Sequence, residues 1–179
     1  WIYFMDGQTI LSQSGVSIST DTNWEMKSDL DFDGDGKSDV LLRNNQSGAW
    51  WMYQMSGSSV LDNGSVNLSS SSNWELAGSG DFDGDGKADV LLRNTVTGGW
   101  WMYQMDGRTV LSSGGLSLSS NLDWQIAGVA DFDGDGNSDI LIRNQSFGGW
   151  WLYLMDGQMI QTSGNINATS SFNWEPQRI

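Results

Sequence analysis

The stretch Asp31-Phe-Asp-Gly-Asp-Gly36 returns unchanged at Asp81 and again at Asp131, so it recurs every 50 residues. The surrounding sequence keeps the same period, because a series of tryptophans with this spacing begins at Trp24 and continues to Trp174. A fixed period of this length marks an array of similar supersecondary units. The 179 residues therefore hold about three and a half units.

Composition narrows the classes of function. The chain has 22 acidic and 8 basic residues, a formal net charge of −14, no Cys and no His. Such a surface does not suit nucleic acid, whose phosphates require Lys and Arg. Without Cys there is no disulfide or thiol chemistry, and without His there is no ordinary serine triad. No apolar run reaches the roughly 18 residues that span a bilayer, so we expect no membrane span.

One repeat, residues 73–120, is the clearest guide to local structure. Trp74, Leu76 and Gly78 alternate with more polar residues, which predicts a strand that carries these three on one face. The acidic turn follows, and residues 90–93 form a short aliphatic run that predicts a second strand. Because no stretch has a 3.6-residue apolar period with caps, we expect no helix.

The third strand of this repeat, residues 100–105, is apolar on both faces. Trp100 and Met102 lie on one face, while Tyr103 and Met105 lie on the other. A strand of this kind must be covered on both sides. The next strand follows an Asp-Gly turn and is more polar, as expected for an outer edge.

Four antiparallel strands per unit, with buried inner strands and a solvent-exposed outer strand, predict the blade of a β-propeller. The expected fold is therefore all-β, a propeller-type array of about three and a half blades that forms part of a larger propeller or assembly. A β-solenoid is the rival, but its coils are usually shorter, and a β-sandwich needs no strict repetition. The expected segments are a partial blade at 1–22, blades with an acidic loop at 23–72, 73–122 and 123–172, and the first strand of a partial blade and chain end at 173–179.

The acidic turn itself predicts a cation site. Its carboxylates at Asp31, Asp33, Asp35 and Asp39 occupy positions 1, 3, 5 and 9, with glycine at position 6. The first half has the spacing of an EF-hand, and the backbone carbonyl of Lys37 is the natural fifth donor. A polar hairpin without metal is the alternative, but four close carboxylates repel one another unless a cation lies among them. The flexible oxygen shell favours Ca²⁺ over Mg²⁺.

The motif Asp-Phe-Asp-Gly-Asp-Gly-Lys-Ser-Asp-Val-Leu, between a Trp-containing strand and a Trp-rich strand, resembles the FG-GAP or VCBS repeats of secreted bacterial proteins. Similar repeats build the calcium-bearing propellers of integrin α subunits and of certain fungal lectins. The resemblance implies three Ca²⁺ sites. The implied ligands are Asp31, Asp33, Asp35, Lys37 (carbonyl) and Asp39; Asp81, Asp83, Asp85, Lys87 and Asp89; and Asp131, Asp133, Asp135, Asn137 and Asp139.

Aromatic residues offer a second candidate site. The tryptophans that open each third strand, Trp50, Trp100 and Trp150, could stack on sugar rings, and repeated sites would give multivalent binding. The alternative, which their place in a doubly apolar strand favours, is packing between blades. The recurring arginines at strand ends could bind a ligand, but they are expected instead to pair with neighbouring acids; they are Arg43, Arg93 and Arg143.

Three functions remain open. The first is a calcium-stabilised extracellular module for binding or adhesion, with a glycan or a protein as ligand. The second is a structural subunit of a surface filament or homo-oligomer, assembled through incomplete terminal blades. The third is an accessory domain of a secreted hydrolase. We expect no enzyme in this chain, because its carboxylate clusters occur in triplicate whereas an active site needs one asymmetric constellation.

Overall fold

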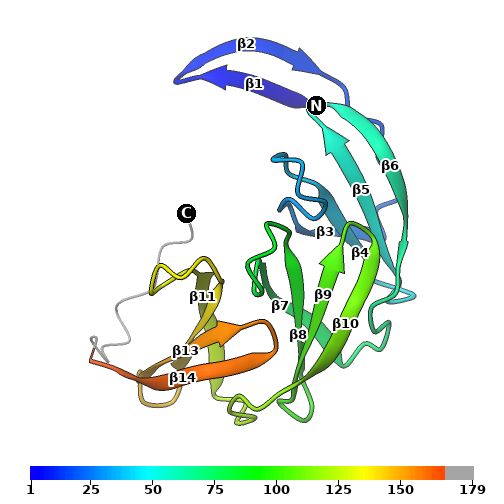
Figure 1. Ribbon diagram of the computed structural model, residues 1–179. Helices are drawn as coiled ribbons and strands as arrows, with labels where there is room; N and C mark the ends of the chain where they lie inside the picture. Colours follow the sequence, from blue (N-terminus) through cyan, green and yellow to red (C-terminus); the bar gives the residue numbers. More distant parts are fainter. Residues whose placement is uncertain (168–179) are drawn as a thin grey trace.

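The computed structural model describes residues 1–167 and consists of antiparallel sheets joined by turns and loops (Figure 1). Within these residues there is no helix, as expected. Residues 1–167 contain no helix that is long and apolar enough to cross a membrane. The segment expected at 173–179 and the end of the 123–172 segment lie outside the described residues.

The described chain forms one hairpin and three four-stranded sheets, which confirms the all-β array of blades. The hairpin consists of β1 (Ile2–Asp6) and β2 (Thr9–Ser14). The blades are β3 (Trp24–Ser28), β4 (Val40–Asn44), β5 (Trp50–Ser56) and β6 (Ser59–Val66); β7 (Trp74–Gly80), β8 (Asp89–Asn94), β9 (Trp100–Asp106) and β10 (Thr109–Leu116); and β11 (Trp124–Ala130), β12 (Asp139–Asn144), β13 (Trp150–Asp156) and β14 (Met159–Ile166). The division of the chain into domains at the expected boundaries stays a prediction.

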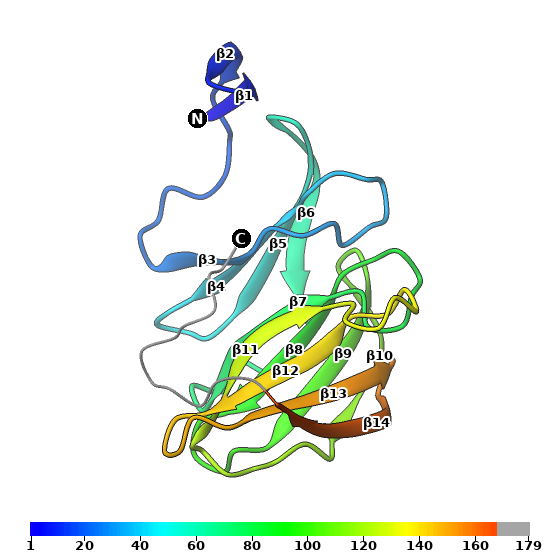
Figure 2. The same cartoon turned by 90° about the vertical axis from the view of Figure 1, so that its left-hand side faces the viewer.

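Strand order within each blade follows chain order, so every connection is a hairpin or a short loop. The blades stand one after another in an open arc, and the β1–β2 hairpin lies at one end of it (Figures 1 and 2). The outer strands β6, β10 and β14 expose most of their residues, as expected for polar edges.

The first strand of each blade contains an irregularity that the alternation did not predict. In β7 the register with β8 shifts between Leu76 and Gly78, and equivalent shifts occur in β3 and β11. The extra residue of a bulge reverses the side-chain alternation beyond it. Leu76 packs toward the preceding blade, whereas a Cβ added at Gly78 would meet Val129 of the following blade. The expectation that Gly78 shares a face with Leu76 is therefore wrong.

The hydrophobic core lies between blades rather than inside one. Each of the two core clusters joins one face of a blade to the opposing face of the next. Trp100 and Met102 belong to one cluster while Tyr103 and Met105 belong to the other, which confirms the doubly covered third strand. A single blade therefore cannot bury its apolar surface alone, and neighbouring blades stabilise each other.

Candidate metal centre

The acidic loop joins the first two strands of each blade and is organised by its leading aspartate. In the first loop the Asp31 carboxylate accepts hydrogen bonds from the backbone N–H groups of Gly34 and Gly36, both at 2.7 Å. Both glycines have a positive backbone φ, 78° and 81°, which residues with a Cβ rarely adopt. The same bonds recur in the second and third loops. The Gly pattern thus folds the loop around position 1.

The aspartate at position 9 is buried and links the loop to the third strand of the blade. Asp39 is fully buried, and its two carboxylate oxygens accept hydrogen bonds from the backbone N–H groups of Phe32, at 3.0 Å, and Met55, at 2.8 Å. Asp89 and Asp139 make the equivalent bonds. Desolvation raises the pKa of Asp39 and Asp139, and raises the pKa of Asp89 to about 7. A cation beside these carboxylates would offset the cost of burying their charge.

Each loop brings three carboxylates close enough to share one ion. One oxygen from each member lies within 4.8 Å of the others in three separate clusters. These clusters are Asp31, Asp33 and Asp39; Asp81, Asp83 and Asp85; and Asp131, Asp133 and Asp139. The donors are all oxygen, as hard divalent cations require, and the set fits Ca²⁺. Three triads, one in each described acidic loop, could therefore hold a metal ion.

The remaining predicted ligands lie beside the triads. The carboxylate of Asp35 forms an ion pair with Lys37 at 2.5 Å, whereas the Lys87 ammonium lies 2.9 Å from Asp106. Both pairs are at the surface, and Lys side chains are flexible enough to release a carboxylate to a cation. Ligation by the predicted residues outside the triads stays a prediction; these are Asp35, Lys37, Lys87, Asp89, Asp135 and Asn137.

A glutamine at the edge of two sites was missed by the sequence reasoning. The side-chain amides of Gln54 and Gln104 donate to the carboxylates of Asp33 and Asp83, at 2.8 and 2.7 Å. The signal was present, because both glutamines follow the Trp-Met-Tyr motif at the same position of the period. The third repeat has Leu154 there. The third loop therefore lacks this orienting bond.

Every complete junction fastens the loop of one blade to the next blade. The carbonyls of Asp31 and Phe32 accept hydrogen bonds from the backbone N–H groups of Ala88 and Gly107, both at 2.7 Å. The ring of Phe32 is 0% exposed and packs in the cluster that contains Val90. The second loop repeats these contacts, with Asp81 bonded to Ser138, Phe82 bonded to Gly157, and the Phe82 ring in the second cluster.

The loop phenylalanine anchors its loop on two blades. Phe32 and Phe82 pack on the following blade as well as on their own. Phe132 is 46% exposed because no further blade follows it among residues 1–167. The third loop is correspondingly open, with Asp131 and Asp133 exposed where their equivalents in the first two loops are half-buried.

The tryptophans considered for sugar binding occupy the blade junctions. Trp50 and Trp100 are each 2% exposed, and the guanidinium groups of Arg43 and Arg93 lie over their rings at 5.0 and 4.4 Å. Trp150 is half-buried with a cation over its ring as well. The faces of Trp50 and Trp100 are occupied, so the suggestion that they stack on a sugar is not supported and the packing alternative accounts for them.

The arginines share one geometry in the first two blades, and it differs in part from the expectation. Arg43 donates to the backbone carbonyls of Trp74 and, at 2.9 Å, Ser71, both at the start of the next blade. Arg93 donates in the same way to Trp124 and, at 2.8 Å, Asn121. These side chains bond to carbonyl groups across a junction, because the first strand of the next blade presents its backbone there. Arg43 also has a favourable charge interaction with Glu75, as expected for pairing with a neighbouring acid.

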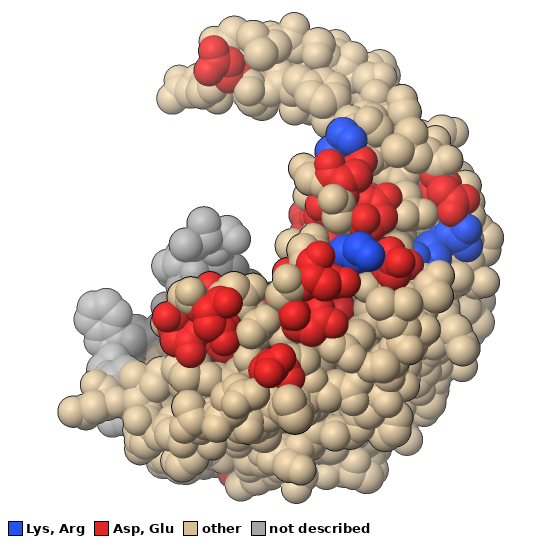
Figure 3. Space-filling view, in the orientation of Figure 1, with Lys and Arg blue, Asp and Glu red and all other residues tan. Residues whose placement is uncertain are grey.

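The acidic loops share one side of the molecule. In Figure 3 the acidic side chains gather along the inner rim of the arc, with few basic groups beside them. Such a concentration of like charge is unfavourable without counterions. The surface view therefore agrees with the loop geometry in favouring cations at this rim.

Comparisons with known proteins identify the repeat. A family model described as FG-GAP-like repeat matches residues 31–92 and 81–142, which together cover more than half of the chain. A search of curated proteins and a search of solved structures each found no match. The matched segments run from one acidic loop through the next, so they contain the junction described above. The chain belongs to the FG-GAP-like repeat family.

Proposed function

We propose that this chain is a calcium-stabilised extracellular binding module that recognises carbohydrate through pockets between its blades. The observation that carries the calcium part is the position of the three carboxylate triads. Each lies in a loop whose backbone, in the first two repeats, is bonded to the following blade. An ion that orders such a loop also orders a junction, so it stabilises the array by mass action.

An extracellular setting suits this chemistry. Free calcium is abundant outside cells, where oxygen-only sites of moderate affinity stay loaded. The chain also contains no Cys to oxidise. The repeated carboxylate site occurs in triplicate, whereas an active site needs one asymmetric constellation, so we propose a non-catalytic module.

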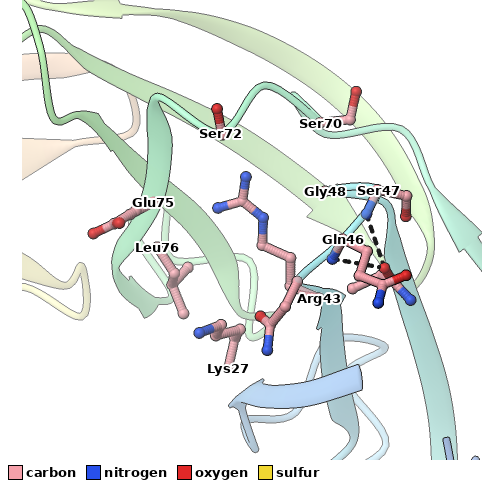
Figure 4. A pocket seen from close by; sticks show the side chains of 11 residues that line it. Lys27, Arg43, Gln46, Ser47, Gly48, Ser70, Ser72, Glu75 and Leu76 are labelled. Carbon is pink, nitrogen blue, oxygen red and sulfur yellow. Dashed lines mark hydrogen bonds between the residues drawn. The ribbon is translucent and has the colours of Figure 1, made fainter. Parts of the chain in front are cut away.

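The candidate ligand site is a pocket of about 520 Å³ between the first two blades. Figure 4 shows the Arg43 side chain at its centre, with Glu75 and Leu76 on one side and Ser70 and Ser72 on another. Polar groups that can bond hydroxyls around a small apolar surface suit a sugar ring. The wall is tightly built, because a Cβ at Gly48 would overlap the carbonyl of Ser70.

A related pocket recurs one repeat later. It measures about 410 Å³ and is lined by Arg93, Gln125 and Ile126, the equivalents of Arg43, Glu75 and Leu76. The two pockets share Glu75, which lies on the strand between them. Repeated sites at fixed spacing give avidity to a branched or polymeric glycan even if each site binds weakly.

A glycan array probed with labelled protein, in calcium and in chelator, tests this function. We expect binding in calcium, and we expect Glu75→Gln to reduce it at least about tenfold by removing a charged acceptor. Asp62→Asn is the control, since Asp62 is a surface carboxylate whose partner is Arg108, and neither residue lines either pocket. Silence across chemically varied glycans, or equal loss in both variants, would contradict carbohydrate binding.

A further inference from the structure

The acidic loops of neighbouring blades are bonded directly to one another. The backbone N–H of Ala88, at position 8 of the second loop, donates to the carbonyl of Asp31, at position 1 of the first loop, at 2.7 Å. Ser138 of the third loop donates in the same way to Asp81 of the second loop. Asp31 and Asp81 both belong to carboxylate triads. A backbone hydrogen bond therefore joins the first candidate ion site to the second loop, and the second site to the third loop.

A single peptide group takes part in two loops. The group between Lys87 and Ala88 carries both the predicted carbonyl ligand of the second loop and the N–H that bonds to Asp31. A trans peptide group is planar, so its C=O and N–H point in opposite directions and turn together. Aiming the Lys87 carbonyl at an ion in the second loop thereby aims the Ala88 N–H at the first loop. A cation that polarises this carbonyl also strengthens the hydrogen bond donated by the same group.

The side chain of Lys87 packs beside this hydrogen bond. Its stem lies against Gly34 of the first loop, where an added Cβ would come within 3.2 Å of the Lys87 Cγ. Gly34 is one of the residues whose N–H holds the Asp31 carboxylate. We call the Ala88–Asp31 hydrogen bond and the Lys87–Gly34 packing, together, the inter-loop contact. It ties position 7 of the second loop, a predicted ligand, to the position-1 ligand of the first loop.

We propose that calcium binding in one acidic loop raises the calcium affinity of the adjacent loop through the inter-loop contact, so that neighbouring sites load cooperatively. This inference rests on the calcium sites of the proposed function and adds their coupling. An ordered second loop supplies the N–H donor and the Lys87 packing that the first loop uses, so less ordering remains when the first loop binds its ion. Because coupling between sites is reciprocal, the first loop favours the second by the same factor.

Repulsion between two bound cations acts in the opposite direction. Each loop carries four aspartates and at most one lysine, so its formal charge stays negative after one divalent ion has bound. Salt screens the interaction between exposed charges over about 8 Å at physiological ionic strength. The backbone hydrogen bond is short-ranged and is not screened in this way. We therefore expect the coupling to be positive at physiological ionic strength.

Calorimetric calcium titration of variants with chosen loops disabled measures this coupling. Asp131→Asn leaves the adjacent first and second loops, and adding Asp81→Asn or Asp31→Asn leaves one of these loops alone. The coupling factor is the product of the two Kd values measured alone, divided by their product in the pair. We expect a factor of at least about five. Asp81→Asn by itself is the matched control, because it leaves the first and third loops, which are not successive in the array, and their factor should be close to one.

Replacing Lys87 tests the inter-loop contact itself. In the Asp131→Asn protein, Lys87→Ser removes the packing on Gly34 and should reduce the coupling factor at least about twofold. Lys37→Ser is the matched control, since it removes the same cation from position 7 of the first loop and leaves the inter-loop contact in place. Its coupling factor should match that of Asp131→Asn.

The outcomes separate this inference from the proposed function. A coupling factor of one or less in loops that do bind calcium, or equal coupling in Lys87→Ser and Lys37→Ser, would overturn the inference and leave the calcium sites in place. No calcium binding by the wild-type protein would overturn both. Thermal melts establish that each variant folds; if a multiple variant does not, the isotherm of Asp131→Asn still decides, because positive coupling makes it steeper than independent binding allows.

Discussion

At the scale of single residues, the junction arginine is the side chain whose role is clearest. Arg93 is buried, donates to two carbonyl groups of the next blade and stacks on Trp100. Its loss leaves buried carbonyls without donors, which costs about 1–3 kcal/mol for each group. Arg93→Ala is therefore expected to lower the free energy of unfolding by roughly 2–4 kcal/mol in urea denaturation.

Two variants bracket this prediction. Arg93→Lys keeps the charge but not the planar fork, so most of the loss should remain. Arg108→Ala removes an arginine whose ion pair with Asp62 is at the surface, so it should cost less than about 1 kcal/mol. Equal effects of Arg93→Ala and Arg108→Ala would show that the carbonyl bonds do not hold the junction.

Gly98 is a second residue whose identity has a structural reason, because its position does not tolerate a Cβ. It has a φ of 72°, and a Cβ there would overlap the carbonyl oxygen of Ser120. Gly98→Ala is expected to destabilise the protein by about 2 kcal/mol or more, through strain and displacement of the Ser120 segment. Gly164→Ala, where a Cβ meets nothing within 4 Å and φ is ordinary, should be neutral or slightly stabilising in the same thermal melt.

At the scale of elements, the three acidic loops share a motif but not an environment. Lys87 of the second loop covers Gly34 of the first, and Asn137 covers Gly84. The third loop has no such cover among the described residues, and it has Leu154 in place of the orienting glutamine. A less rigid, more hydrated loop binds Ca²⁺ more weakly.

We therefore expect calcium titration by calorimetry to resolve two tighter sites and one weaker site, differing at least about threefold in Kd. Asp131→Asn should remove the weaker phase, and Asp81→Asn should remove a tighter one. Three indistinguishable sites in the wild-type protein would contradict this difference between the loops.

Much of each element could be predicted from the sequence, because the same residue pattern occurs in three successive repeats. The apolar residues on both faces of 100–105 predict a strand covered on both sides, and the spacing of the carboxylates predicts the loop. The bulge near Ala77 could not be predicted, since one skipped residue leaves no mark in composition. Nor could the partners of Arg93 or Phe82, because both act across a junction, and periodicity within one blade does not say which face meets the neighbour.

At the scale of the whole molecule, stability depends on contacts between neighbouring blades and on the charge of the inner rim. The net charge is −14 and the loops concentrate much of it. Without bound cations the carboxylates repel one another, and salt screens that repulsion. In chelator, the melting temperature should rise as NaCl is added from low to physiological ionic strength; in saturating calcium, the same salt should have a smaller effect. An equal salt effect in both conditions would show that the rim is not relieved by calcium.

The calcium dependence of thermal unfolding tests the account most directly. A bound calcium ion would stabilise the folded chain by RT ln(1 + [Ca²⁺]/Kd), about 2.7 kcal/mol at one hundred times the Kd of its site. Melting curves followed by circular dichroism, in calcium and in chelator at constant ionic strength, should therefore show a large rise in melting temperature with calcium. Asp31→Asn, Asp81→Asn and Asp131→Asn together should abolish that rise. If the wild-type protein melts at the same temperature in calcium and in chelator, the acidic loops are not stabilising calcium sites.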